Sequence, residues 1–284
     1  MQTSNFVLNF SHTSIDLTKK IAVMGILNLT PNSFYDGGKY QTEKNILKQV
    51  EKMIEEGVDI IDIGGESTKP FAREISWEEE AKRTIPYIQK ITSLFKIPLS
   101  IDTYKAKMAK MAIEAGVELV NDISGLRFDP CMAEVVSLNN VFLVLMHIKG
   151  TPRNMQDNPH YDFLIPEIIS YLKESVKIAT DAGINLEKII VDPGIGFGKI
   201  LEQNLFILKN LKELEILQRP ILIGVSRKSF IGEFLKLPLK ERLLGGLAAT
   251  CVAVIGGARI VRTHDVKETR QAVDLVNAIL QSRI

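Results

Sequence analysis

Short apolar runs rich in β-branched residues alternate along this chain with longer segments whose apolar residues recur at helical spacing. The short runs are apolar on both faces, which is typical of parallel strands covered by helices. Eight such runs and eight helical segments can be counted. The predicted strands span residues 21–29, 58–64, 98–102, 119–123, 141–147, 189–192, 220–226 and 259–264.

The segments between the runs carry the marks of helices. Ser76 and Glu79 have the spacing of a capping box that opens one of them. Three glycines, Gly57, Gly116 and Gly183, stand where the residue after a helix must adopt a positive φ. An apolar stripe on one face of the first helical segment consists of Ile46, Leu47, Val50, Met53 and Ile54.

This alternation predicts one closed (β/α)8 TIM barrel rather than an open doubly wound sheet or two domains. No stretch rich in Pro, Gly or Ser interrupts the series. Residues 1–20 precede the first predicted strand and hold two short apolar runs, at 6–10 and 15–17. We expect an N-terminal extension over residues 1–20, which can form a hairpin plugging the base of the barrel, and a barrel over residues 21–284.

Composition narrows the class of protein. The chain has 284 residues, 45% hydrophobic and 24% charged, and a net charge of +1, which gives no reason to expect a nucleic acid or a membrane surface as partner. Residues 1–12 lack the features of a signal peptide, and the longest apolar stretch, at 247–255, is too short to span a bilayer. Cys131 and Cys251 are expected to be buried hydrophobes in a reducing compartment. A cytoplasmic protein is predicted.

A barrel of this kind places its site at the carboxyl ends of the strands. The residues predicted there are Asn28, Glu66, Ser67, Thr68, Lys69, Asp102, Asn121, Asp122, His147, Asp192, Ser226, Arg227, Lys228, Ser229, Arg262 and His264. They contain no Ser-His-Asp order, no thiol nucleophile, no clear zinc constellation and no strong phosphate-binding glycine motif.

Two kinds of chemistry remain among these residues. Asp102, Asn121 and Asp192 offer acceptors for a flat heterocycle rich in N–H donors, since a carboxylate can accept two parallel bonds from an amidine-like edge. A second group, Lys228, Arg262 and His264, suits a phosphate or diphosphate. Asn28 and Asp36 offer hard oxygens for Mg²⁺, which commonly binds through few protein ligands and substrate phosphates.

A structural explanation stays open for each residue alone. Asp102 and Asp192 can cap the helices that follow them. Asn121 can satisfy a turn, while Lys228 and Arg262 can be solvated charges. His147 is expected to fill or hydrogen-bond a layer of the barrel rather than to catalyse, and Asp122 is expected to point away from the site.

Eight segments together resemble the dihydropteroate synthase family, in that family's order. They are GILNLTPNSFYDGG, GGESTKP, SIDTYKA, NDISG, MHIKGTPRNMQ, VDPGIGFGK, SRKSFIG and VRTHD, and the likeness extends over residues 22–274. The resemblance implies a (β/α)8 barrel, usually homodimeric, that acts in folate biosynthesis. Members join 4-aminobenzoate to 6-hydroxymethyl-7,8-dihydropterin diphosphate, which gives 7,8-dihydropteroate and diphosphate, and sulfonamides compete for the aminobenzoate site.

The same resemblance assigns roles to individual residues. It implies that Asn28 ligates a Mg²⁺ bound to the diphosphate. It places Asp102, Asn121 and Asp192 along the pterin edge with Lys228 on its other polar side, and Arg262 near the pterin plane, holding the diphosphate with His264. The aminobenzoate would be bordered by Thr68, Pro70, Phe197 and Ser229. Two mobile loops would close over the reaction: residues 30–40, with Thr30, Pro31, Ser33 and Asp36, and residues 67–73, with Lys69.

A mechanism follows from these roles. Diphosphate leaves a CH₂ group attached to an electron-rich ring, so the transition state resembles a delocalised carbocation. Asp102 and Asp192 favour the positive ring, while Mg²⁺, Arg262 and His264 favour the departing anion. The amine attacks as a neutral nucleophile, and no dedicated general base is needed.

Four loop residues depart from the family pattern. Asn32, Tyr35, Lys69 and Phe71 stand where Asp, Ser, Arg and Gly are usual. Lys69 keeps the charge of arginine but loses its planar fork. The departures predict a raised KM for 4-aminobenzoate, a parallel loss of sulfonamide affinity and ordinary binding of the pterin diphosphate.

Two other functions remain open from the sequence. A methyltetrahydrofolate-binding methyltransferase barrel would share the Asp and Asn contacts to the pterin, but it needs neither the diphosphate-binding residues nor the TPNSF loop. A catalytically silent, pterin-binding paralogue would be expected to lose Asn28, Lys228 or Arg262, and all three are present.

Overall fold

The computed structural model describes residues 6–30, 43–68 and 72–282. Its centre is a closed barrel of parallel strands in the order β10-β3-β4-β5-β6-β7-β8-β9. The strands are β3 (Ala22–Asn28), β4 (Ile60–Gly64), β5 (Leu99–Asp102), β6 (Leu119–Asp122), β7 (Phe142–Met146), β8 (Ile189–Asp192), β9 (Ile221–Gly224) and β10 (Ala258–Thr263). The predicted (β/α)8 barrel is confirmed.

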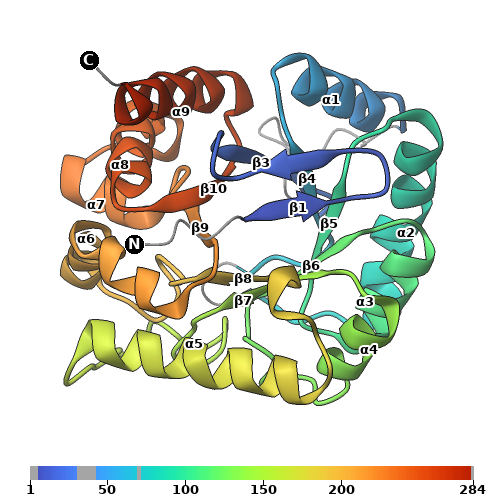
Figure 1. Ribbon diagram of the computed structural model, residues 1–284, viewed down its shortest axis with the longest axis horizontal. Coiled ribbons are helices and arrows are strands. Elements are labelled where there is room, and N and C mark those ends of the chain that lie inside the picture. Colours follow the sequence, from blue (N-terminus) through green and yellow to red (C-terminus); the bar gives the residue numbers. More distant parts are fainter. Residues whose placement is uncertain (1–5, 31–42, 69–71, 283–284) are drawn as a thin grey trace.

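Helices surround this barrel on the outside (Figure 1). They are α1 (Glu43–Glu55), α2 (Trp77–Leu94), α3 (Ala106–Glu114), α4 (Met132–Asn139), α5 (Leu164–Asp181), α6 (Leu201–Lys209), α7 (Ser229–Leu235), α8 (Leu243–Ile255) and α9 (Val266–Gln281). Both α7 and α8 lie between β9 and β10, so the prediction of one helical segment after each strand was wrong there. The short α7 begins directly after Lys228, in a segment for which no separate helix was predicted.

Alternation along each strand sends every second side chain into the barrel. In β4, Ile60 belongs to the apolar interior of the barrel, while Ile61 and Ile63 pack with the surrounding helices. The same rule turns Ile260 of β10 inward and Val261 outward. Inward positions are therefore apolar in the lower half of the barrel and become polar towards the carboxyl ends of the strands.

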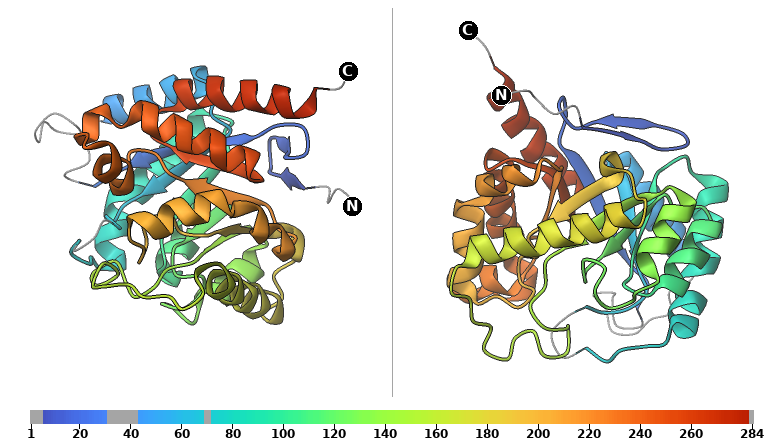
Figure 2. Two further views of the ribbon diagram at one scale, coloured as in Figure 1. Left: turned by 90° about the vertical axis from the view of Figure 1, so that its left-hand side faces the viewer. Right: turned by 60° about the horizontal axis from the view of Figure 1, so that its bottom comes forward.

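The N-terminal extension forms a hairpin that closes the base of the barrel. Its strands β1 (Val7–Asn9) and β2 (Ser14–Asp16) pair antiparallel. Four of its side chains, Leu8, Phe10, Ile15 and Leu17, are buried against the lower interior residues of the barrel. Each buried leucine or isoleucine contributes roughly 1.5–3 kcal/mol. Figure 2 shows the hairpin and the long connection 147–163 at opposite ends of the barrel.

The predicted helix signals are mostly present. Gly57, Gly116 and Gly183 have φ values of +86°, +109° and +90°. Ser76 caps α2, with its side chain accepting from the backbone N–H of Glu79. The carboxylate of Glu79 does not complete a reciprocal box, because it pairs with Arg83.

The two cysteines are placed differently from the prediction. Cys131 is exposed and Cys251 is half-buried, so the prediction that both are buried was wrong. Cys131 is the residue that precedes the first turn of α4. In the described ranges, every helix is too short or too polar to cross a bilayer. Several loop residues of the predicted site lie outside the described residues: Pro31, Asn32, Ser33, Tyr35, Asp36, Lys69, Pro70 and Phe71.

Candidate active site

Strand pairing brings the predicted polar residues to one level of the barrel. Asn28 pairs in register with Gly64, Gly64 with Asp102, and Asp102 with Asn121. Across the barrel, Asp192 ends β8 opposite Met146 of β7. Each lies at the carboxyl end of its strand, so these side chains converge at the mouth of the barrel, opposite the hairpin.

Arg262 is the centre of a largely buried ionic network in this mouth, with its own side chain 20% exposed. Its Nε donates to Oδ2 of Asp62 at 2.6 Å, and its Nη2 donates to Oδ2 of Asp102 at 2.7 Å. Asp62 also accepts from Nδ2 of Asn121 at 3.1 Å. Arg262 thus points into the barrel and forms one cluster with two of the predicted pterin contacts.

Burial sets the protonation behaviour of this cluster. It raises the pKa of Asp102 to about 7, an effect that Arg262 opposes and the carboxylate of Asp62 reinforces. Within the described residues, Oδ1 of Asp62 and Oδ1 of Asp102 are buried without a hydrogen-bond partner. Unpaired acceptor atoms are therefore present where a heterocycle rich in N–H donors is expected.

Asp192 and Lys228 form the other polar side of the mouth. Burial raises the pKa of Asp192, while Lys228 opposes that shift. Burial lowers the pKa of Lys228 to about 8, against the attraction of Asp192. The ammonium group of Lys228 donates to the carbonyl of Ile195 and lies 4.7 Å from the ring centre of Phe197. The predicted residues Lys228, Asp192 and Phe197 are thus brought together.

The loop after β8 is pressed against the loop after β7. A Cβ atom on Gly194 would lie 1.9 Å from the carbonyl oxygen of His147, and one on Gly198 would lie 2.4 Å from that of Lys149. Inside this contact, Nζ of Lys199 bonds Nδ1 of His147 and the carbonyl of Phe197, both at 2.9 Å. The loop that carries Phe197 is therefore fixed from below.

His147 has the structural place that was predicted for it. Its ring is buried and packs 4.6 Å from the ring centre of Tyr171. Burial and the charge of Lys199 hold the pKa of His147 well below its usual range. Asp122 also turns away from the site, as expected, because its carboxylate accepts from the backbone N–H groups of Ser124 and Leu126.

The remaining predicted residues lie around the rim. His264 is exposed, and Ser226 Oγ lies 3.2 Å from its Nδ1. The predicted strand included His264, but β10 ends at Thr263. Strand alternation therefore does not place His264 on the same side as Arg262. Ser229 is exposed at the start of α7, and Thr68 is half-buried after β4. The roles assigned to these three side chains stay predictions.

Two buried charged residues near the mouth, Asp62 and Lys199, and the half-buried Lys105 were not predicted as site residues. Asp62 and Lys199 are 0% and 2% exposed. Lys105 bonds Glu66 at 2.6 Å and Glu80 at 2.8 Å beside the β4 end. The signal for Asp62 is its place on the inward face of a strand, two residues before Gly64, where an unpaired carboxylate is costly.

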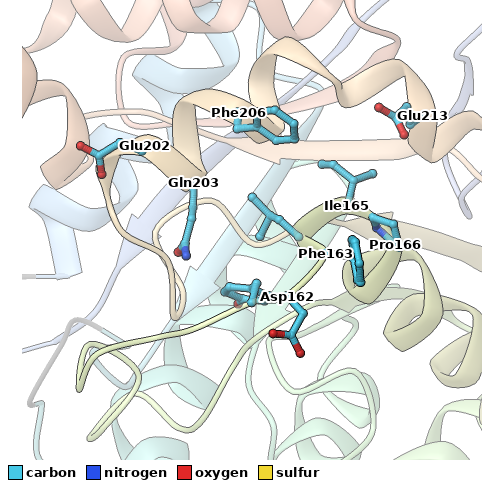
Figure 3. Close-up of a pocket in the computed structure, with 10 residues that line it drawn as sticks. Asp162, Phe163, Ile165, Pro166, Glu202, Gln203, Phe206 and Glu213 are labelled. Atoms are coloured by element: carbon cyan, nitrogen blue, oxygen red, sulfur yellow. The ribbon is translucent and has the colours of Figure 1, made fainter.

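A separate cavity lies outside the mouth, between the start of α5 and α6 (Figure 3). It has a volume of about 510 Å³, and it contains none of the residues of the ionic network. Aromatic and aliphatic side chains line it together with Asp162, Glu202 and Glu213. We place the chemistry in the mouth, where the charged groups converge.

The sequence profile described as "Pterin binding enzyme" matches residues 24–264. The chain therefore belongs to the pterin-binding enzyme family. Within it, the chain belongs with the dihydropteroate synthases. One relative of that name from Clostridium beijerinckii is 47% identical over 267 residues, which cover 94% of this chain and 97% of the relative.

Solved structures agree with this placement. The dihydropteroate synthase of Yersinia pestis, in a complex with a sulfonamide drug, has a TM-score of 0.93 and 39% identity, covering 97% of this chain and 100% of its own. The dihydropteroate synthase of Xanthomonas albilineans with 4-aminobenzoic acid has a TM-score of 0.91 and 37% identity, covering 98% of this chain and 100% of its own. The chain is a transferase of this fold and family.

Proposed function

We propose that this chain joins 4-aminobenzoate to (7,8-dihydropterin-6-yl)methyl diphosphate, with 7,8-dihydropteroate and diphosphate as products, in folate biosynthesis. The observation that carries the proposal is the convergence of Asp102, Asn121 and Asp192 with two cations in one barrel mouth. Such a set matches a ring that has N–H donors on one edge and acceptors on another.

The reaction needs two opposite charges to be stabilised. The C–O bond to diphosphate breaks and its electron pair leaves with the diphosphate oxygen. The amine nitrogen then forms the C–N bond and loses one proton, which the released diphosphate or water takes up. Asp102 and Asp192 lie where they can stabilise a cationic ring, and Arg262 and His264 are assigned to the anion. Lys228 and Phe197, which are in contact through the ring face, are assigned to the border between the two substrates.

We also propose that Mg²⁺ accompanies the diphosphate, with Asn28 as a ligand. A Cβ atom on Gly64 would lie 3.4 Å from Oδ1 of Asn28 and 3.9 Å from Cβ of Asp102, so this amide oxygen lies over the end of β4 at the mouth. In the described ranges, no three His, Cys, Asp or Glu residues cluster as a metal site. One amide oxygen fits an ion that is held mainly by substrate phosphates. The Mg²⁺ ion would neutralise part of the negative charge of these phosphates.

The protein is further proposed to form a homodimer and to be inhibited by sulfonamides. Exposed apolar side chains on two packed helices, α7 and α8, support a homodimer: Phe234, Leu235, Leu244, Val252 and Ile255. Sulfonamides are proposed to compete with 4-aminobenzoate, supported by the sulfonamide complex of the Yersinia pestis relative. The cytoplasmic location stays a prediction.

Two measurements separate this function from its rivals. Diphosphate release is followed from the pterin diphosphate with and without 4-aminobenzoate and Mg²⁺, and release that requires the amine supports the synthase. A silent paralogue would bind the pterin diphosphate in calorimetry without releasing diphosphate. A methyltransferase would bind methyltetrahydrofolate and would release no diphosphate. The full-length likeness to dihydropteroate synthases argues against this function.

A further inference from the structure

We propose that Asp62 is a positioning residue of the pterin site, whose carboxylate orients Arg262 and Asn121 and places a negative charge beneath the ring during the reaction. The inference rests on the proposed function. Asp62 is completely buried, so its effect on the substrate must pass through these neighbours and through its charge.

Asp62 links distant parts of the barrel. It lies on β4, whereas its two partners lie on β10 and β6, each two strands away on opposite sides. A single oxygen, Oδ2, accepts from Nε of Arg262 at 2.6 Å and from Nδ2 of Asn121 at 3.1 Å. Because Nδ2 of Asn121 is engaged below, its Oδ1 is left as the acceptor for the ring.

The charge of Asp62 is incompletely compensated by its neighbours. One guanidinium group, that of Arg262, serves both Asp62 and Asp102. Oδ1 of Asp62 is buried without a hydrogen bond among the described residues. A second buried carboxylate with a bare oxygen weakens the folded state. Such a cost is typical of a functional site, where the excess negative charge can stabilise a cationic transition state.

The same charge acts on Asp102. Two cations, Arg262 and Lys228, face Asp102, and three carboxylates, those of Asp62, Glu66 and Glu80, oppose its ionisation. Removing the charge of Asp62 takes away one repulsive neighbour and leaves Asp102 as the one carboxylate that accepts a hydrogen bond from Arg262 in the described part of the chain, while Asp192 still attracts Arg262 from farther away. Both effects lower the pKa of Asp102, so Asp102 would remain ionised at lower pH.

The first test is Asp62→Asn, which keeps the shape of the side chain. We measure kcat and kcat/KM for the pterin diphosphate across the pH range. The expected result is a kcat lower by roughly tenfold or more on the plateau, together with an acid limb moved to lower pH. If Asp62 were merely structural, the substitution would lower thermal stability, or lower the rate by the same factor at every pH, and the acid limb of the pH profile would stay in place. An unmoved acid limb overturns the proposal.

The second test is Asp62→Ala with added sodium formate, with sodium chloride at equal ionic strength as control. A formate-specific gain in kcat supports the need for a carboxylate beneath the ring, and equal rates in both salts argue against it. If no Asp62 variant folds, the residue is structural and the proposal is overturned.

The two proposals fail in different ways. A wild-type protein without amine-dependent diphosphate release contradicts the proposed function. In that case, calorimetry of hydroxymethylpterin still tests Asp62, since Asp62→Asn should move the pH dependence of binding in the same direction. Unchanged pH dependence of binding would contradict the role of Asp62 alone.

Discussion

Asp192 offers a buried carboxylate at the end of β8, with Oδ1 accepting from the N–H of Gly194 at 2.7 Å. Asp192→Asn keeps the shape but replaces one acceptor of the pterin edge by a donor. We expect kcat/KM to fall about 10²-fold or more with the fold intact. Asp181→Asn makes the same chemical change at an exposed site on α5 and should leave activity unchanged. Activity of Asp192→Asn within a few-fold of wild type would contradict the assignment.

The pH dependence of activity follows from two shifted groups. The pKa of Asp102 is raised to about 7, so its accepting carboxylate is lost as the pH falls through that value. The pKa of Lys228 is lowered to about 8, so its charge is lost as the pH rises through that value. We expect a narrow bell-shaped profile of kcat/KM with limbs near these values. A profile flat from pH 5.5 to pH 9.5 would show that neither ionisation matters.

Single residues could be predicted where strand ends mark them. Asp102, Asn121 and Asp192 stand directly at the ends of apolar runs, and the barrel rule places them in the mouth. Asp62 could not be found in that way, because it lies inside an apolar run and its partners lie two strands away. Lys199 was missed for a similar reason, since its bond to His147 joins two loops that are far apart in sequence.

The loop after β8 depends on a close backbone contact with the loop after β7. Gly194 has φ +70°, and a Cβ atom there would lie 1.9 Å from the carbonyl oxygen of His147. Gly194→Ala should therefore lower the free energy of unfolding by about 2 kcal/mol or more, because backbone must move. Gly246→Ala in α8 is the control, since its Cβ would meet its nearest atom at 3.9 Å and alanine favours helix.

Thermal or denaturant unfolding of both variants measures this difference. Equal stability of Gly194→Ala and wild type would mean that the two loops are not pressed together. Most elements were predictable because periodicity and glycine positions are local signals. Two features were not predicted correctly. The helix α7 has only 7 residues, which is too short for a clear periodic pattern, and β10 ends at Thr263, one residue before the predicted end.

The whole molecule is proposed to be a homodimer through α7 and α8. Leu244 on α8 and Leu138 on α4 are both 77% exposed, which makes them a matched pair. Leu244→Glu should give a monomer in sedimentation experiments, because a charge would be buried in the interface. Leu138→Glu should leave the dimer intact. A wild-type monomer, or a dimer unaffected by Leu244→Glu, would rule out this interface.

At this scale the sequence predicted the architecture well. Eight apolar runs without a linker can close only in a few ways, and the hairpin of residues 7–16 fills the end that the strands leave open. The ionic network could not be predicted in the same way, because it depends on which inward side chains meet across the closed barrel.

Product formation tests the central claim most directly. The protein is incubated with the pterin diphosphate, Mg²⁺ and 4-aminobenzoate carrying a deuterated ring, and the products are measured by mass spectrometry and a diphosphate assay. The expected product is 7,8-dihydropteroate that carries the label, in amounts equal to the diphosphate released. Diphosphate release without labelled 7,8-dihydropteroate, or no release at all from folded protein, would contradict the proposed function.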